Sequence, residues 1–532
     1  MKTIPAGWRA LLPMFGIRPA DLRRHCLIIL LASLASALRV LAMAAYRPAF
    51  EFAGDSYAYL QLARHLTPDS VRPAGYPAML RALAGTGELW VVPAVQHALG
   101  VTLGLVLYAL LTHRGIAPGV AALAAAPVLL DAYQVNIEHF VMAETLFDVL
   151  MVAGVVALLW DPQPSPWACG LAGGTLALAA LVRTVGIALG LLALLYLVAR
   201  RVGWSRSVAF AGTLAVPLLG YMFWFHTTHG SYALTGGDTY WLYGRVAPIA
   251  DCARLDLTPS TNQLCSPHPP GERPGPNYYV WNHHSPRFTL GLPETAKKAA
   301  LADFAHQVIE HQPEDYARMV LGDVAHYFAP GRRTGPRDWP VGTWHFPAGP
   351  VPAYWNTSAP LVTFDGGWAA RGVAPAPAAF LRAYQRHVYT PGPALGALAV
   401  LAVLGAAAGV PRRSRASRNG EHGETGRIRA DCALLITAGM ALLVIPSATV
   451  CFDYRYMLPT LLLFPPAAAF GWHQVTAARA AAEPPPLPGK GAGWPPEPAT
   501  AGNKDFYDHG VNNRICPTPI LPLGAPADGG TA

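Results

Sequence analysis

The sequence predicts an all-α polytopic membrane protein with about ten transmembrane helices and an extracytoplasmic, mixed, loop-rich insert. Of the 532 residues, 52% are hydrophobic and only 13% are charged, about half the charged fraction of an average soluble protein. The apolar residues also come in long blocks, as bilayer-spanning helices require. No basic surface with interleaved aromatic residues is visible, so the formal charge of +8 does not indicate a nucleic-acid partner.

The apolar blocks define the expected domain organisation. We expect a cytoplasmic segment over 1–24, a transmembrane core over 25–225, an insert over 226–391, C-terminal transmembrane helices over 392–477 and a disordered cytoplasmic tail over 478–532. The expected spans cover residues 25–45, 90–111, 117–132, 143–160, 167–182, 185–199, 207–225, 392–410, 431–449 and 456–474. Several are shorter than the roughly 20 residues that cross hydrocarbon unaided, so they are tilted, re-entrant or longer than these bounds.

Positive charges orient the chain in the plasma membrane. The N-terminal segment, Arg114, the Arg200–Arg206 segment and the arginines of 412–429 all fall on one side if the count of ten spans is right. Under the positive-inside rule that side is cytoplasmic, together with both termini. The loop 46–89 and the insert 226–391 then face outward.

The insert contains a pair of closely spaced cysteines, Cys252 and Cys265. An oxidising compartment and a short intervening loop favour a disulfide between them, and two free thiols are the alternative. The best helical stretch of the insert is 295–328, where Ala300, Phe304 and Val308 recur at helical spacing.

The outward loop 46–89 contains the strongest candidate for a catalytic residue. Asp55 follows a glycine and opens a short amphipathic run with Tyr59 on its apolar face. Asp55 either caps this helix, which is worth about 1 kcal/mol, or acts as a general base at the outer membrane surface. The Pro-rich turn that follows contains Arg72 and Tyr76, and Arg72 can bind a phosphate or anchor in the membrane interface.

A second acidic turn lies between the third and fourth expected spans. It contains Glu138, His139 and Glu144, and Glu144 opens the fourth span, where an ionisable side chain is costly and usually faces a cavity. Glu138 and His139 can instead be ordinary loop residues. A Glu/His pair also permits a divalent cofactor such as Mg²⁺ or Mn²⁺, although this pattern alone does not specify a metal.

Two arginines lie at predicted outward turns, Arg183 after the fifth span and Arg455 beside Tyr456 before the last. Positive charge on the outer side runs against the usual bias, which favours a role in holding a phosphate or diphosphate leaving group over topological anchoring. The candidate donor- or acceptor-binding residues are therefore Tyr59, Arg72, Tyr76, Glu138, His139, Glu144, Arg183, Arg455 and Tyr456.

These features together resemble the GT-C superfamily of membrane glycosyltransferases. The resemblance rests on an outward Asp55 with Tyr59 after the first span, the turn RPAGYP at 72–77, the acidic turn at Glu144 and the closing segment YRYMLP at 454–459. Within the superfamily, the chain is most similar to protein mannosyltransferases and aminoarabinose transferases.

The resemblance implies a hexosyl- or pentosyltransferase that takes a sugar from a polyprenyl-phosphate carrier. The sugar passes with inversion to an extracytoplasmic glycan, lipid or protein, with Asp55 as the general base. Glu144 or Glu138 takes the second acidic position, which helps to bind metal, donor or acceptor. The chain departs from the pattern at Ser56, where many relatives have Glu, and in its insert, where many relatives have a C-terminal domain instead.

Two other classes of function stay open. A transporter or lipid flippase predicts paired broken helices in matching halves and ionisable residues near mid-membrane. A non-catalytic envelope scaffold would use the insert to bind a partner, and its acidic outward loops would be incidental.

Overall fold

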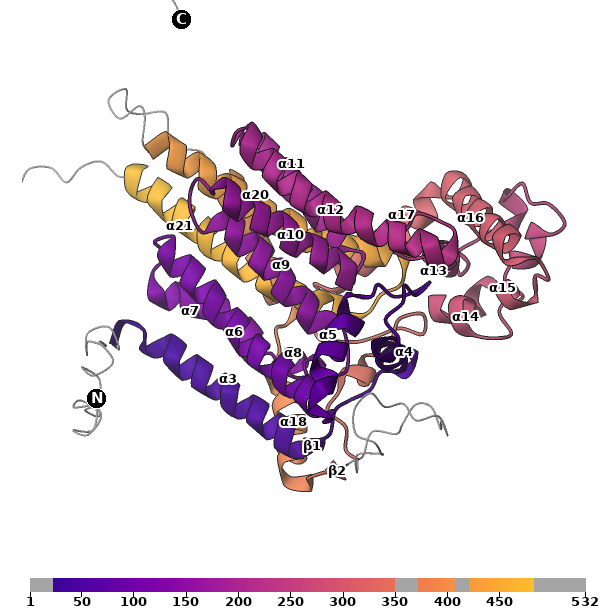
Figure 1. Cartoon of the computed structure of the whole chain (residues 1–532), viewed down its shortest axis with the longest axis horizontal. Coiled ribbons are helices and arrows are strands. Elements are labelled where there is room, and N and C mark those ends of the chain that lie inside the picture. Colours follow the sequence, from indigo (N-terminus) through magenta and orange to yellow (C-terminus); the bar gives the residue numbers. More distant parts are fainter. Residues whose placement is uncertain (1–22, 350–371, 408–420, 483–532) are drawn as a thin grey trace, which may run out of the picture. The chain divides into compact units, whose positions relative to one another are not determined.

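The structure, a computed structural model, is built from helices and describes residues 23–349, 372–407 and 421–482 (Figure 1). A helix lies at each segment predicted to span the membrane. These helices are α3 (Cys26–Ala45), α6 (Val91–His113), α7 (Pro118–Leu130), α9 (Glu144–Leu159), α10 (Pro166–Val182), α11 (Gly186–Ala199), α12 (Trp204–His229), α19 (Gly392–Ala407), α20 (Glu421–Thr449) and α21 (Phe464–Ala482). Residues 1–22 of the predicted N-terminal segment, the linker 408–420 and the predicted tail from 483 lie outside the described residues.

Shorter elements connect these helices or build the insert. The α-helices are α4 (Ala53–Arg64), α5 (Gly75–Leu83), α8 (Ala132–Ile137), α13 (Asp238–Val246), α14 (Pro276–Trp281), α15 (Pro286–Thr289), α16 (Glu294–His311), α17 (Pro313–His326) and α18 (Pro375–His387). The 3-10 helices are η2 (Ala84–Thr86), η3 (Cys252–Arg254), η4 (Thr261–Leu264), η5 (Pro270–Glu272), η6 (Val341–Trp344) and η7 (Tyr454–Leu462). Strands β1 (Tyr46–Arg47) and β2 (Gly372–Val373) pair antiparallel and tie the end of α3 to the end of the insert.

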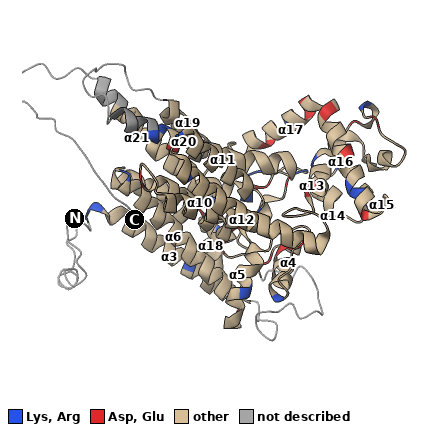
Figure 2. Ribbon diagram, turned by 45° about the horizontal axis from the view of Figure 1, so that its top comes forward, with Lys and Arg blue, Asp and Glu red and all other residues tan. Residues whose placement is uncertain are grey.

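The bundle helices have the composition of membrane spans. Among the described helices, α3, α6, α12 and the Arg427–Thr449 part of α20 are each long and apolar enough to cross a membrane, and the bent pair α18–α19 would add a fifth span. Figure 2 shows few charged residues along α3, α6, α10 and α12. On α12, Val216 and Leu219 point outward with 70% and 61% exposure, as expected where lipid is the neighbour. The chain is an all-α multi-pass membrane protein, and the number of ten spans stays a prediction.

Glycines allow neighbouring helices to approach closely. A Cβ atom at Gly173 of α10 would lie 2.2 Å from the carbonyl oxygen of Phe210 in α12. Gly405 of α19 and Gly471 of α21 meet in the same way, with a Cβ at Gly405 only 2.1 Å from the Gly471 Cα. Close backbone contact between small residues is a common source of packing energy between helices in lipid.

The last apolar segment begins later than its predicted start at residue 456. Residues 454–462 form the 3-10 helix η7, and α21 starts only at Phe464. Pro459 cannot donate a backbone hydrogen bond inside η7, whereas Pro465 and Pro466 suit the first turn of α21. Arg455 therefore lies on a separate turn that packs against the bundle.

The insert packs in two parts. Residues of α13, α14 and α16, including Tyr243 and Phe304, share a core of their own. Tyr327 and Trp344, farther along the insert, join the main core of the bundle instead. The predicted helix 295–328 is confirmed but breaks between α16 and α17, where Pro313 begins the second helix. The insert boundaries and its outward location stay predictions.

The predicted disulfide between Cys252 and Cys265 is present. It joins η3 to the residue that follows η4, and both sulfur-bearing residues pack at the edge of the insert's own core. The bridge therefore closes a loop within the irregular segment between α13 and α14.

Candidate functional site

A cluster of charged side chains from five segments meets at one end of the bundle. Asp55 lies in the first turn of α4, Arg72 precedes α5, and Glu144 is the first residue of α9. Arg183 directly follows α10, and Arg455 lies in η7. Because α9 and α10 are consecutive and pack together, the start of one and the end of the other share an end of the bundle. We call these five residues the arginine–carboxylate cluster.

Asp55 does not cap α4, so that interpretation of the sequence is wrong. Phe52 is the N-cap residue and makes no side-chain cap hydrogen bond. The Ser56 hydroxyl instead accepts a hydrogen bond from the Phe52 N–H at 2.8 Å and donates one to the Val141 carbonyl at 2.8 Å. Ser56 thus fixes the start of the helix, and the Asp55 carboxylate is left to interact with side chains.

The Asp55 carboxylate binds the guanidinium group of Arg72. Its Oδ1 atom accepts hydrogen bonds from Arg72 Nη2 at 2.5 Å and from Nε at 3.0 Å. The turn that presents Arg72 is ordered by Asp69, whose Oδ1 accepts the backbone N–H groups of Val71 and Arg72 at 3.0 and 2.9 Å. Gly75 completes the turn, because a Cβ there would lie 2.5 Å from the Leu181 carbonyl oxygen at the end of α10.

Arg455 connects the two acidic residues of the cluster. Its Nη1 atom lies 3.7 Å from Asp55 Oδ2 and 3.5 Å from Glu144 Oε1. Arg183 Nη1 donates to the same Glu144 oxygen at 2.6 Å. The buried second oxygen of Glu144, Oε2, has no hydrogen-bond partner among the described residues. Three guanidinium groups around two carboxylates can bind a further anion, and phosphate fits their paired donors.

Tyrosine rings form one wall of the cluster. The Arg72 guanidinium lies 5.9 Å from the centre of the Tyr59 ring. Tyr456 lies under two cations, 5.5 Å from Arg183 and 5.0 Å from Arg455. These distances are within the range of cation–π attraction, which holds the guanidinium groups in place without using their N–H donors.

Tyr76 supports this wall from beneath. Its ring meets that of Tyr59 edge-on at 4.9 Å, and its hydroxyl donates to Gln96 Oε1 at 3.0 Å. Burial raises the pKa of Tyr59, and the nearby Asp55 carboxylate raises it further. The Tyr59 hydroxyl therefore keeps its proton and can act as a hydrogen-bond donor.

Sequence reasoning placed Asp453 in the same turn as Arg455 but missed the aromatic residues Trp344 and Phe52 that help to hold Arg455. Trp344, in the insert, donates from Nε1 to Asp453 Oδ1 at 2.7 Å, and its ring lies 5.5 Å from the Arg455 guanidinium. Asp453 Oδ2 lies 3.0 Å from Arg455 Nε as an ion pair without hydrogen-bond geometry. The Phe52 ring covers the guanidinium from another side at 4.9 Å. Trp344 and Asp453 are 109 residues apart, and no local pattern links them.

Glu138 and His139 lie away from this cluster. Glu138 is fully buried and accepts hydrogen bonds from Arg39 Nε and Nη2, both at 2.8 Å. His97 contacts Glu138 Oε2 at 2.9 Å and His139 Nδ1 at 3.1 Å. Burial lowers the pKa of His139 well below its usual value. These residues join α3, α6 and the turn before α9 inside the bundle, and we expect them to stabilise the fold.

The described residues do not form a metal site. No group of three or more His, Cys, Asp or Glu side chains gathers among them in a way that could hold an ion. The two carboxylates of the cluster, Asp55 and Glu144, are each paired with arginines. The described residues therefore do not fit the suggested Mg²⁺ or Mn²⁺ site.

Comparison with known proteins gives remote structural likenesses only. No protein-family model and no curated protein matches the sequence. The Saccharomyces cerevisiae protein O-mannosyltransferase Pmt1–Pmt2 complex, solved with its sugar donor bound, is similar over 46% of this chain and 38% of that chain, with 16% identity and a TM-score of 0.33. ArnT from Cupriavidus metallidurans, solved in the apo state, is similar over 84% of this chain and 77% of that chain, with 15% identity and a TM-score of 0.30.

Both solved structures are of glycosyltransferases from the GT-C superfamily, which the sequence of this chain resembles. The alignment spans well under half of the mannosyltransferase chain. Structural similarity this low does not show that the activities are the same. Support for a function comes instead from the arginine–carboxylate cluster.

We expect Glu138→Gln to destabilise the protein strongly, because it leaves Arg39 buried without a counter-charge. Breaking a buried ion pair costs about 3–5 kcal/mol. The thermal unfolding midpoint of the purified protein measures the effect, with Glu294→Gln, on the exposed surface of α16, as the control. Adding Arg39→Met to Glu138→Gln should recover part of the loss. A Glu138→Gln protein as stable as the wild type would contradict the structural role.

The stability of the site should also depend on the ionisation of Asp453. Burial raises the pKa of Asp453 to about 6, with Arg455 opposing the shift. Since the folded-state pKa lies above the unfolded value, the stabilising contribution of protonated Asp453 is complete below about pH 4 and is lost as the pH rises through 6.

Asp453→Asn, which cannot ionise, should therefore gain stability relative to the wild type as the pH rises from 4 to 8, by roughly 2–3 kcal/mol. Unfolding midpoints of both proteins at the two pH values test this expectation. A difference between the two proteins that does not change with pH would show that Asp453 does not titrate in this range.

Proposed function

We propose that the chain is a membrane glycosyltransferase that moves a sugar from a polyprenyl-phosphate carrier to an extracytoplasmic glycan, lipid or protein acceptor, with inversion. The observation that carries the proposal is the arginine–carboxylate cluster. It combines a partly exposed carboxylate with three guanidinium groups at the end of an apolar helix bundle. A base and a phosphate site side by side are what such a transfer requires.

Asp55 is the general base in this proposal. Its side chain is 26% exposed, whereas that of Glu144 is 5% exposed and that of Asp453 is 1% exposed. The Oδ1 atom is occupied by Arg72, and Oδ2 lies 3.7 Å from Arg455, which is beyond hydrogen-bond distance. We assign proton acceptance to Oδ2. The paired Arg72 fixes the orientation of the carboxylate, as effective proton transfer requires.

Arg72, Arg183 and Arg455 hold the phosphate of the donor. Each now contacts a carboxylate, and a phosphate oxygen can replace one such partner while Arg183 and Arg455 keep their positions over Tyr456. Preorganised cations stabilise the charge that develops on a phosphate leaving group, which is commonly the largest single contribution to catalysis.

In this proposal the sugar is transferred in a single displacement at the anomeric carbon. The acceptor hydroxyl gives its proton to Asp55 as its oxygen forms a bond to the anomeric carbon. The bond from that carbon to the phosphate oxygen breaks, and polyprenyl phosphate leaves with the electron pair next to the arginines. Attack on the face opposite the leaving group inverts the anomeric centre.

The lipid part of the donor suits the position of the cluster. Asp55 and Arg183 lie where apolar helices end, so a long isoprenoid chain can stay in the bilayer while its phosphate reaches the arginines. The sequence also has no Gly-rich phosphate loop of the kind that holds nucleotide donors. The donor class, the acceptor and the outward location of this end belong to the proposal.

Asp55→Asn tests the proposed chemistry, because asparagine keeps the shape of the side chain but cannot accept the proton. We expect the transfer rate to fall by about 10²–10⁴-fold. The assay incubates purified protein with a panel of polyprenyl-phosphate hexoses and pentoses and with envelope acceptors, and it follows release of polyprenyl phosphate.

Asp69→Asn is the matched control. It removes a carboxylate 4.0 Å from the same Arg72, but asparagine retains the oxygen that accepts the Val71 and Arg72 backbone N–H groups. We expect this variant to keep most of the activity. Wild-type transfer by Asp55→Asn would exclude Asp55 as the base. Absence of transfer by the wild-type protein with every donor would favour the transporter or scaffold alternatives.

A further inference from the structure

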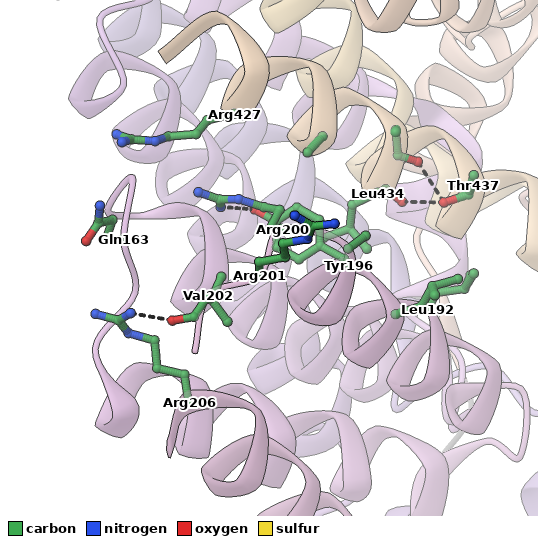
Figure 3. A pocket seen from close by; sticks show the side chains of 14 residues that line it. Gln163, Leu192, Tyr196, Arg200, Arg201, Val202, Arg206, Arg427, Leu434 and Thr437 are labelled. Atoms are coloured by element: carbon green, nitrogen blue, oxygen red, sulfur yellow. Dashed lines mark hydrogen bonds between the residues drawn. The ribbon is translucent and has the colours of Figure 1, made fainter. Parts of the chain in front are cut away.

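A second polar site lies at the other end of the bundle from Asp55. Helix α11 begins just after Arg183 and ends at Ala199, so Arg200 lies roughly 20 Å farther along the helix axis. There a pocket of about 610 Å³ opens between α11, the start of α12 and α20 (Figure 3). We call it the arginine pocket.

The arginine pocket has a strong excess of positive charge. Arg200, Arg201, Arg206 and Arg427 line it, and none of the lining residues is acidic. These arginines come from three segments, namely the loop after α11, the first turn of α12 and α20. The charge is therefore a property of the fold rather than of one basic run in the sequence.

Not all of these arginines are needed to hold the structure. Arg200 is engaged, because it donates to the Tyr196 hydroxyl at 2.5 Å and the Pro162 carbonyl at 2.6 Å and lies 3.8 Å from buried Asp431. Asp431 is already paired with Arg114 at 2.8 Å. By contrast, Arg201 forms no ion pair with any residue whose side chain the structure describes, and Arg427 lines the pocket from α20.

One further detail indicates unused binding capacity. Arg206 donates to the Val202 carbonyl through Nη1, but its buried Nε has no hydrogen-bond partner among the described residues. Buried polar groups in folded proteins nearly always have a partner, so an unpaired donor at the pocket is consistent with a ligand that binds there. The positive φ of Arg201, 50°, has a local cause instead, because Arg201 follows the end of α11 in a left-handed turn closed by a hydrogen bond from the Val202 N–H to the Leu197 carbonyl.

The pocket is apolar on its other side. Figure 3 shows the guanidinium groups of Arg427 and Arg206 and the Gln163 amide at one side, and Leu192, Leu434 and Thr437 toward the other. Leu195, which also lines the pocket, is 62% exposed on the outer face of α11, where the neighbour in a membrane is lipid. A ligand that spans the pocket therefore has an anionic head and an apolar tail.

We propose that the arginine pocket binds an anionic phospholipid, with the phosphate on Arg201, Arg206 and Arg427 and the acyl chains along Leu192 and Leu195. Basic pockets between helices at the cytoplasmic end of membrane proteins commonly hold lipid headgroups. On the predicted topology this end is cytoplasmic, where anionic lipids are abundant. The proposal does not depend on the glycosyltransferase activity.

The test compares lipids on the full-length protein purified in a neutral detergent. Phosphatidylglycerol and phosphatidylcholine with the same acyl chains are titrated, and binding is followed by native mass spectrometry and by the unfolding midpoint. We expect wild-type protein to prefer phosphatidylglycerol. In Arg201→Gln/Arg427→Gln, which removes two positive charges that line the pocket, its affinity should fall about 10–100-fold.

Arg23→Gln/Arg24→Gln is the matched control. It removes the same charge near the start of α3, which lies outside the pocket, and it should bind phosphatidylglycerol like the wild type. Equal binding of both lipids to the wild type, or unchanged binding to the Arg201/Arg427 variant, would overturn the proposal. Stabilisation by inorganic phosphate equal to that by the lipid would also overturn it, because the pocket would then bind a soluble anion.

Discussion

The arrangement of the site depends on the position of Arg455. This one guanidinium group lies within 3.7 Å of Asp55 and within 3.5 Å of Glu144, which come from segments almost ninety residues apart. It stays charged in a buried setting because carboxylates, aromatic rings and the 3-10 turn η7 surround it. Trp344 of the insert donates a hydrogen bond to Asp453, which in turn pairs with Arg455. The long insert therefore also helps to build the site.

The sequence was sufficient to predict the helical membrane fold and most of the cluster. Apolar blocks predicted the helices. The predicted topology puts Arg183 and Arg455 on the outer side, against the usual bias of positive charge, and this made both arginines candidates. The sequence favoured Glu144 over Glu138, because Glu144 opens a predicted span, but both stayed candidates for the second acidic position. The two glutamates differ in their arginine partners, because Glu138 binds Arg39 and Glu144 binds Arg183. The sequence does not show that Arg39 of α3 lies next to Glu138. Asp55 looked equally suited to capping, since the role of Ser56 depends on the distant Val141 carbonyl.

The two ends of the bundle differ in charge balance, and this difference separates the two proposed roles. At the Asp55 end, arginines are paired with carboxylates, so a phosphate must displace a carboxylate to bind and can leave again when the carboxylate returns. At the Arg200 end, none of the described residues that line the pocket is acidic, so an anion can bind there without displacing a carboxylate. The first arrangement suits a substrate that turns over, and the second suits a resident lipid.

The central claim is that the arginines of the cluster hold the phosphate of a polyprenyl-phosphate ligand beside Asp55. The most direct measurement is an experimental structure of the full-length protein with polyprenyl monophosphate bound. We expect phosphate oxygens within about 3 Å of at least two of Arg72, Arg183 and Arg455, with the isoprenoid chain leading into the bilayer. A phosphate bound elsewhere, with the arginine–carboxylate pairs intact, would contradict the account.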